Sequence, residues 1–242
     1  MSSEPQGGAG GARGAERDAR EFGAWNEEMV RRYDIERYYE RSHPIVRWVE
    51  ARRLKALRDL AAARPGDRLL EVGCGAGHVL DGFAQARRFG ADLSETMLGR
   101  ARRRLGGEVP LLRGNAERLP YADGSFDVVV CTEVLEHTQQ PAEVLAELMR
   151  VAAPGGRVVV SIPNEANIDR AKHALARVPL VGRRLLATLA SEANEWHLHH
   201  FDRRMLERLV DGVAEIREVR GVPFGALPLR YVARLARPGD AA

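Results

Sequence analysis

Short apolar runs alternate with amphipathic stretches along most of this chain. An apolar run bounded by turn residues is typical of a strand that is buried on both faces of a sheet. Such runs predict strands at RLLEV (68–72), RFGADL (88–93), VPLLRG (109–114), SFDVVVCT (125–132) and GRVVVSIP (156–163). Helical spacing of the apolar residues between the runs predicts helices at 79–87, 94–105 and 141–151. Strands separated by helices indicate a parallel sheet with helices on both faces.

The two ends of the chain extend this pattern. Apolar residues recur at helical spacing over 25–63, which predicts two or three helices before the first strand. A helix at 203–210 precedes two last strands, at 215–222 and 230–237, and these are expected to pair antiparallel because no helix separates them. Residues 164–196 fit no strand–helix unit and predict an insertion after the fifth strand. The expected fold is therefore α/β, a doubly wound, mostly parallel seven-stranded sheet.

Length and composition indicate how many domains the chain forms and argue against several classes of protein. The chain has 242 residues, 45% hydrophobic and 29% charged, which suits one domain over 21–242 behind a disordered Gly/Ala/Arg-rich tail at 1–20. It contains no apolar stretch near the ~20 residues of a membrane span and no secretory signal. The two cysteines lack metal-site spacing, which favours a reducing cytoplasm. A net charge of +3, spread along the chain, predicts no nucleic-acid partner.

Three glycines directly after the first strand, Gly73, Gly75 and Gly77, point to a bound ligand. Glycine tolerates positive φ and lets the backbone approach a ligand closely, and ligands of open α/β sheets bind at this edge. A nicotinamide fingerprint needs a further glycine where His78 stands, so an oxidoreductase is disfavoured. Asp92, at the end of the second strand, can accept hydrogen bonds from both hydroxyls of a ribose.

Four blocks of the sequence carry a family resemblance: LLEVGCGAG, GADLSETML, GNAERLPYADGSFDVVVCTEVLEH and LMRVAAPGGRVVVSIPN. Together they resemble the class I S-adenosylmethionine-dependent methyltransferases of small molecules, including the ubiquinone-biosynthesis O-methyltransferases. The resemblance implies a Rossmann-like fold and S-adenosylmethionine as cofactor. The aromatic-rich N-terminal helices, over 21–63, are expected to form a lid over a small-molecule pocket. It assigns the cofactor to Glu71, Gly73, Gly75, Gly77, Asp92, Leu93, Asn115, Ala116 and Thr132.

One of these residues departs from the family pattern. The family usually has Asp where Asn115 stands, accepting a hydrogen bond from the adenine amino group. The Asn115 amide oxygen can accept the same hydrogen bond without charge assistance, so weaker adenine recognition is expected. In the resemblance the glycines pass beneath the methionine part of the cofactor and Glu71 lies near its ammonium group.

The acceptor is expected to be a small molecule, methylated on oxygen. Methyltransferases of nucleic-acid amino groups usually carry an Asn/Asp-Pro-Pro-aromatic signature after the fourth strand, where this chain reads CTEV. Two alternatives stay open: N- or C-methylation of a natural product or lipid, and a cofactor-binding partner subunit without catalysis. Candidate substrate contacts in the N-terminal segment are Tyr33, Tyr38, Tyr39 and His43, and ordinary packing explains these equally well. Trp196 and His197 are further candidates, although histidines in such a place are more often structural. His200 and His137 are candidate catalytic residues.

The segment TEVLEH (132–137) suggests a binding site for a divalent cation. Glu133, Glu136 and His137 are spaced i, i+3 and i+4, which would place them on one face of a helix. Their E-x-x-E-H spacing resembles a metal-binding set proposed for ubiquinone-type O-methyltransferases. Such a cation would lower the pKa of a phenol and hold the phenolate for transfer. His137 can also act as a base without metal.

Basic and apolar residues are interleaved in the insertion, over 168–190. This mixture can lie in a membrane interface, so peripheral membrane contact through 168–190 is one expectation. A lid that packs its apolar side on the protein is the other. The oligomeric state cannot be read from the sequence.

Overall fold

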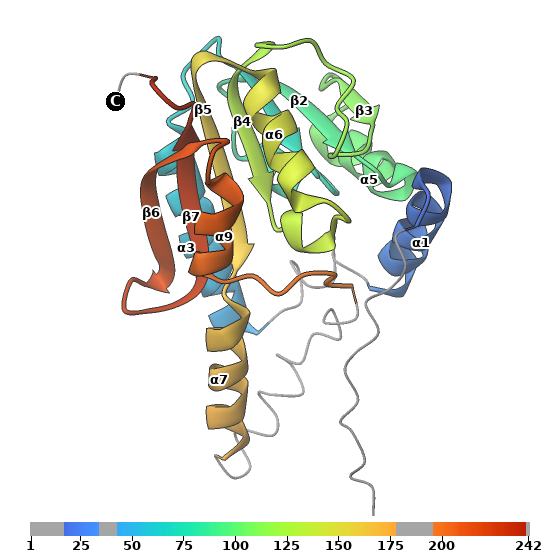
Figure 1. The fold of residues 1–242 in the computed structure, drawn as a ribbon. Helices are drawn as coiled ribbons and strands as arrows, with labels where there is room; N and C mark the ends of the chain where they lie inside the picture. Colours follow the sequence, from blue (N-terminus) through green and yellow to red (C-terminus); the bar gives the residue numbers. More distant parts are fainter. Residues whose placement is uncertain (1–16, 34–42, 178–195, 241–242) are drawn as a thin grey trace, which may run out of the picture.

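A computed structural model describes residues 17–33, 43–177 and 196–240 (Figure 1). Within them one sheet has the strand order β3-β2-β1-β4-β5-β7-β6. The strands are β1 (Arg68–Val72), β2 (Arg87–Asp92), β3 (Leu111–Arg113), β4 (Phe126–Thr132), β5 (Ala152–Pro163), β6 (Glu215–Phe224) and β7 (Leu227–Ala236). The order reverses between β1 and β4, and ligands of doubly wound sheets bind beside such a reversal.

All strand pairs from β3 to β5 are parallel, whereas β7 runs antiparallel to both β5 and β6. The predicted mostly parallel seven-stranded sheet is therefore confirmed, as is the antiparallel last pair. The register pairs Val72 at the end of β1 with Ala91 of β2 and with Cys131 of β4. The carboxyl ends of these three strands consequently lie together at one edge of the sheet.

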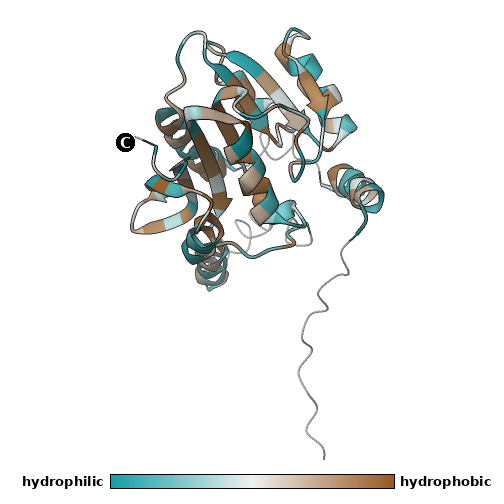
Figure 2. Ribbon diagram, turned by 45° about the horizontal axis from the view of Figure 1, so that its top comes forward, coloured by the Kyte–Doolittle hydropathy of each residue, from teal (hydrophilic) through white to brown (hydrophobic). Residues whose placement is uncertain are grey.

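Helices cover both faces of the sheet. Apolar residues of α3, α4 and α5 pack with β1, β4, β5 and β7 on one face, and those of α6 and α9 pack on the other. Hydrophobic residues accordingly concentrate on the central strands (Figure 2). The helices are α1 (Ala19–Arg32), α3 (Pro44–Ala61), α4 (His78–Asp81), α5 (Glu95–Leu105), α6 (Pro141–Val151), α7 (Glu165–Ala176), α9 (Arg203–Val210) and the 3₁₀ turn η1 (Leu135–His137).

Three helical regions differ from expectation. The helix predicted over 79–87 ends at Asp81, because the next amides bond three residues back and form tight turns: Gly82 N–H donates to Val79 at 3.0 Å. Helix α1 begins at Ala19, so residues 19 and 20 are helical where the sequence predicted a disordered tail, and 1–16 lie outside the described residues. Helix α7 occupies the start of the predicted insertion, and 178–195 lie outside the described residues. In the described ranges, no helix combines the length and apolarity needed to cross a bilayer.

Candidate cofactor and acceptor site

A cavity opens at the edge where β1, β2 and β4 end. It encloses about 750 Å³ of empty space, with the open solvent at its mouth included. Its walls come from α1, the glycine turn after β1, the ends of β2 and β4, the start of α5 and the segment at Trp196. The lining residues are Phe22, Asn26, Val30, Val72, Gly73, Gly75, Asp92, Leu93, Met97, Gly114, Asn115, Ala116, Glu133, Val134, His137, Thr138 and Trp196.

The glycine turn is required by backbone conformation and by close packing. Gly73 has φ +72°, and a Cβ there would lie 2.2 Å from Cγ2 of Val134, so only glycine fits between the strand ends. Gly75 has φ +49°, and the space a Cβ would occupy is open to 4 Å. Gly75 therefore leaves a hollow in the wall that a ligand can enter.

Asp92 fixes this turn from the neighbouring strand. Its carboxylate accepts hydrogen bonds from the backbone N–H of Gly75 at 2.8 Å and of Ser94 at 2.8 Å. Burial raises the pKa of Asp92, and these two N–H bonds offset part of that rise. Each carboxylate oxygen keeps a second acceptor site, so two donors of a ligand can still bind.

Glu71 lies behind the cavity wall. It is 2% exposed and is not among the lining residues. Burial raises the pKa of Glu71 well above its usual value, although the Arg53 guanidinium acts against the rise and the Asp92 carboxylate adds to it. Its Oε2 has no hydrogen-bond partner among the described residues. Contact of Glu71 with a cofactor ammonium group stays a prediction.

The other predicted cofactor residues divide into two groups. Leu93, Asn115 and Ala116 line the cavity. The position of the Asn115 side chain is fixed by a hydrogen bond that its amide oxygen accepts from the Glu117 N–H at 3.0 Å. Gly77 and Thr132 are outside the lining: Gly77 begins α4 with φ +80°, and Thr132 is buried at the end of β4.

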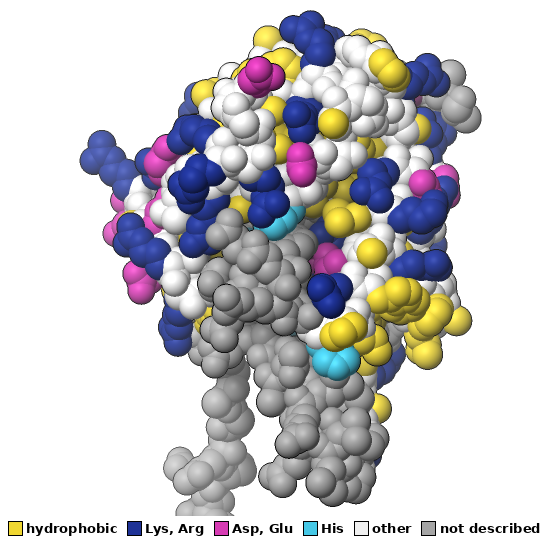
Figure 3. Space-filling view, turned by 180° about the vertical axis from the view of Figure 1, so that it is seen from behind, with side chains coloured by type: hydrophobic (Ala, Val, Ile, Leu, Met, Phe, Trp, Pro, Cys, Tyr) yellow, Lys and Arg dark blue, Asp and Glu magenta, His cyan; other side chains and the backbone are white. Residues whose placement is uncertain are grey.

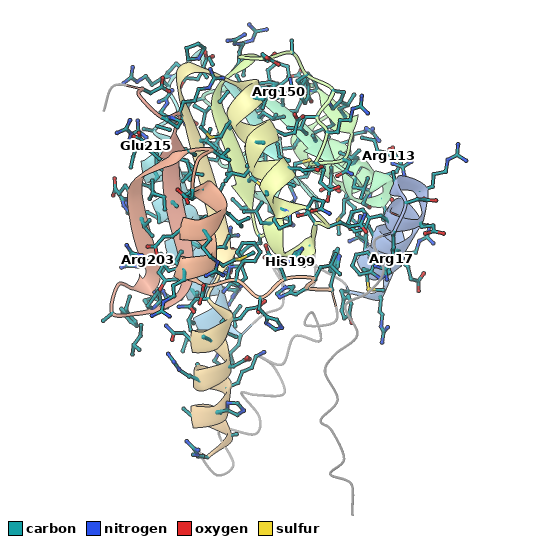
Figure 4. The ribbon with its side chains drawn as sticks, in the orientation of Figure 1. Arg17, Arg113, Arg150, His199, Arg203 and Glu215 are labelled. Carbon is teal, nitrogen blue, oxygen red and sulfur yellow. The ribbon has the colours of Figure 1, made fainter. Side chains whose placement is uncertain are left out.

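Helix α1 falls within the predicted lid, but the wall residues that it supplies were not among the predicted site residues. Phe22, Asn26 and Val30 line the cavity from one face of this helix. Two contacts hold α1 against the rest of the domain. The Glu27 carboxylate accepts a hydrogen bond from the Thr96 hydroxyl at 2.9 Å. The backbone N–H and carbonyl of Arg17, labelled beside α1 in Figure 4, form two hydrogen bonds with the amide side chain of Gln139. The start of α1 had a readable signal, because Asp18 caps it with Glu21 at the third helical position.

An aromatic group joins the end of α1 to η1 in the cavity wall. Trp196 lies between Tyr33 and His137, with ring centroids 6.1 Å and 4.7 Å away. The segment is held over η1 because Leu198 N–H donates to the Glu136 carbonyl at 2.7 Å, and His199 donates from Nε2 to the Thr138 carbonyl at the lower end of α6 (Figure 4). The buried Trp196 indole N–H has no acceptor among the described residues.

His137 is the candidate base in this wall. Its Nδ1 donates to the Trp196 carbonyl at 3.2 Å, which leaves Nε2 as the acceptor nitrogen of the neutral ring. Burial, with a smaller contribution from His197, lowers the pKa of His137 to about 3. The ring is therefore uncharged at neutral pH.

The remaining predicted residues lie farther from the cavity. His197 packs its ring 4.9 Å from that of His137, and its Nδ1 lies 2.7 Å from Oε1 of Glu165, a residue the sequence analysis did not identify. His200 also contacts Glu165, with a side chain 89% exposed, so the structure does not bring it to the cavity. His43 is exposed and caps α3. Tyr38 and Tyr39 lie outside the described residues.

Glu133 belongs to a group of four charged side chains and one serine, here named the charge ring: Glu50, Arg53, Glu133, Ser161 and Arg230. Glu50, Arg53 and Ser161 are buried, and Glu133 and Arg230 are partly buried. The Glu133 carboxylate accepts from the Ser161 hydroxyl at 2.7 Å and from Arg230 Nε at 2.8 Å. Arg53 donates to Glu50 at 2.9 Å and to Ser161 at 3.3 Å, and Arg230 lies 3.5 Å from Glu50. Burial opposes ionisation of Glu133, but Arg230 and Arg53 outweigh it and lower the pKa of this carboxyl.

The predicted metal set of Glu133, Glu136 and His137 is wrong as drawn from the sequence. Glu133 has φ +54° and lies outside any helix, and only the short 3₁₀ turn η1 follows it, so the three side chains do not share a helical face. The charge ring holds the Glu133 carboxylate. In the described part of the chain, ligand atoms within 4.8 Å of one another come instead from Glu136, His137 and His197. The sequence did not predict this second set, because it named His197 as a substrate contact.

The amino-acid sequence of the chain is similar to those of several known proteins. A family profile described as "Methyltransferase domain" matches residues 70–160. The ubiquinone biosynthesis O-methyltransferase of Thiobacillus denitrificans is 32% identical over 92% of this chain and 94% of that protein. The protein of the same name from Hahella chejuensis is 32% identical over 72% of this chain and 73% of that protein.

Other relatives match over less of their length. The ubiquinone/menaquinone biosynthesis C-methyltransferase of Burkholderia mallei is 39% identical, over 41% of this chain and 44% of that protein. The chain spans only 33% of a Streptomyces fradiae transposon protein to which it is 41% identical. Among solved structures, the PH0226 protein of Pyrococcus horikoshii superposes with a TM-score of 0.61 at 17% identity, over 87% of this chain and 98% of that one. That likeness concerns the fold alone.

Proposed function

The chain belongs to the class I S-adenosylmethionine-dependent methyltransferases, and we propose that it methylates a hydroxyl group of a phenolic quinone precursor. The observation that carries the proposal is one cavity in which the Asp92 carboxylate and the neutral His137 ring are both wall residues. Relatives named as ubiquinone and menaquinone methyltransferases support the class of acceptor. Their names include both O- and C-methyltransferases, so the choice of oxygen rests on His137.

The chain's own groups fit the cofactor. When bound, S-adenosylmethionine supplies an electrophilic methyl group on a sulfonium. Asp92 presents a carboxylate at the end of β2 that would accept from the ribose hydroxyls, and the hollow at Gly75 lets the ligand lie against backbone. Leu93, Asn115 and Ala116 would surround the adenine. The protein's contribution is mainly to hold the two reactants in line and to exclude water.

His137 and Trp196 serve the acceptor. An unperturbed phenol has a pKa of about 10, so its proton must be removed as the carbon–oxygen bond forms at neutral pH. Nε2 of His137 has the lone pair that can accept a hydrogen bond from the acceptor hydroxyl, because Nδ1 is held by the Trp196 carbonyl. A pKa of about 3 makes the ring a weak base in the free protein, so we assign it to orienting this hydroxyl and to receiving its proton only as the carbon–oxygen bond forms. The Trp196 indole N–H, which has no acceptor in the described part of the chain, can donate to an oxygen of the acceptor or cofactor.

Replacing His137 with Ala should lower kcat by roughly 10²–10⁴-fold, the usual contribution of a general base. Affinity for S-adenosylmethionine, measured by calorimetry, should change little because the Asp92 end of the cavity is untouched. His200→Ala is the matched control, since this side chain is 89% exposed, and should leave kcat within about twofold. Equal losses in the two variants, or full activity of His137→Ala, would contradict the proposed base.

Chelation separates a metal-free base from a cation held by Glu136, His137 and His197. With His137 as a metal-free base, enzyme treated with EDTA keeps full turnover, and added magnesium changes neither rate nor melting temperature. Loss of turnover on chelation, with recovery on adding magnesium, would instead assign these three residues to a cation. Glu133 is outside both proposals because the charge ring occupies its carboxylate.

Peripheral membrane contact through 168–190 is a separate proposal, of which helix α7 covers only the first part. Arg170, Lys172 and Arg177 supply its basic character in the described residues. The sequence also left open a second function, a cofactor-binding subunit without catalysis. In that case the protein would bind S-adenosylmethionine but would transfer its methyl group to no acceptor.

A further inference from the structure

An exposed apolar patch lies away from the cavity walls. In the described part of the chain six large hydrophobic side chains are exposed, and four of them come from two neighbouring segments. We name these four the tip patch: Ile45 (49% exposed), Trp48 (42%), Phe224 (58%) and Leu227 (70%). Figure 3 shows hydrophobic side chains gathered at the lower right, with Lys and Arg side chains beside them.

The tip patch joins the first turn of α3 to the turn between β6 and β7. The rings of Trp48 and Phe224 lie 5.5 Å apart, so the two segments form one continuous surface. Phe224 and Leu227 pair across the turn at the end of the hairpin. Large apolar side chains at a hairpin tip protrude from the body of a protein, and clustered exposure of this kind marks an interaction site.

The exposed charges beside the tip patch are basic. In residues 43–52 and 221–230 the acidic side chain is Glu50, which is buried and contacts Arg53 and Arg230 of the charge ring. Arg47 and Arg52 are exposed, and the Arg52 guanidinium lies 5.9 Å from the Trp48 ring centroid. The surface therefore offers aromatic and aliphatic groups with positive charge and no exposed carboxylate in these two segments.

The tip patch lies at the same end of the sheet as the cavity, beyond the last strands of the order β1-β4-β5-β7-β6. Pro163, at the carboxyl end of β5, pairs with Arg230, three residues after Leu227. The hairpin tip and the start of α3 thus lie at the sheet edge where the cavity opens, the lower end in Figure 1. A surface bound by the tip patch would lie beside the route to the cavity.

We propose that the tip patch inserts into the interface of an anionic lipid bilayer. Apolar side chains would enter the headgroup boundary, while Arg47 and Arg52 would meet the negative surface. Trp48, next to Arg52, is of the kind enriched at membrane interfaces. A second copy of this chain fits less well, because a two-fold contact through this patch would bring Arg47 and Arg52 toward their own copies. This surface is distinct from 168–190.

Co-sedimentation tests the proposal, using the full chain without cofactor or acceptor. Vesicles of phosphatidylglycerol and phosphatidylcholine should bind the protein at low salt, and vesicles of phosphatidylcholine alone should bind it at least about tenfold more weakly. The double variant Phe224→Ser, Leu227→Ser should lower binding to the anionic vesicles by at least about tenfold. Leu112→Ser, at an exposed leucine of β3 on the far side of the sheet, should change it by less than about twofold.

Unchanged vesicle binding by a folded double variant would overturn the proposal. A dimer in sedimentation velocity that dissociates in the double variant, without vesicle binding by the wild type, would assign the patch to a second copy and overturn it as well. Methyl transfer to a short, water-soluble acceptor is measured separately in both proteins. Failure of the proposed function would appear there, whereas failure of the membrane contact would appear only with vesicles.

Discussion

Replacing Arg53 with Met is expected to lower the free energy of unfolding by about 3 kcal/mol or more, the cost of leaving a buried charge without its partner. Arg53 is 1% exposed, and its guanidinium donates to Glu50 and to Ser161. Without it, buried Glu50 keeps Arg230, 3.5 Å away, as its partner among the described residues, and Ser161 loses one contact. Urea unfolding followed by circular dichroism measures the change.

The same helix offers a matched control. Lys55 pairs with Asp59 at 2.7 Å, but the two side chains are 66% and 40% exposed. Exposed ion pairs contribute little because water and salt screen them, so Lys55→Met should cost at most about 0.5 kcal/mol. Similar losses in the two variants would show that the charge ring does not act as a buried unit.

The second large effect concerns the cofactor. Asp92→Ala should weaken S-adenosylmethionine binding by about 2–4 kcal/mol, since two charge-assisted hydrogen bonds to the ribose would be lost. In dissociation constant this is a factor of roughly thirty to several hundred. Part of the loss comes from the turn itself, because the Gly75 N–H would lose its acceptor. Isothermal calorimetry on the folded variant gives the value directly.

The variant Asp92→Asn tests how much of the cofactor affinity depends on the negative charge of Asp92, because the side chain keeps nearly the same shape. The amide keeps one acceptor oxygen but turns an NH₂ group toward one of the two backbone donors, Gly75 or Ser94. Its affinity should therefore lie between those of the wild type and the alanine variant. A folded Asp92→Ala protein with wild-type affinity would remove Asp92 from the cofactor site.

Local sequence patterns were sufficient for most of the sheet and several helices. Helices α6 and α9 begin and end at the predicted residues, because Pro141 at the first position and Asp202 as a cap mark where they start. The antiparallel pairing of β6 and β7 was predicted because no helix separates these two strands in the sequence. The sequence failed at α4, where a helix-like spacing of apolar residues is accommodated by successive tight turns.

The acceptor side of the site could not be read from spacing. Glu133, Glu136 and His137 are neighbours in sequence, but positive φ at Glu133 sends its carboxylate to Arg230, 97 residues away. Trp196 reaches His137 across 59 residues, and Tyr33 reaches Trp196 from the end of α1. Contacts of this kind depend on tertiary packing and have no local signal.

Methyl transfer from S-adenosylmethionine carrying a labelled methyl group, with a catechol-type quinone precursor as acceptor, tests the central claim most directly. The account predicts that the purified chain places the label in an aryl methyl ether, that Asp92→Ala raises the concentration of S-adenosylmethionine needed for half-maximal rate, and that His137→Ala abolishes most of the turnover. Label on a ring carbon would contradict oxygen as the acceptor. No transfer to any phenolic acceptor by a protein that binds S-adenosylmethionine would contradict the proposed function.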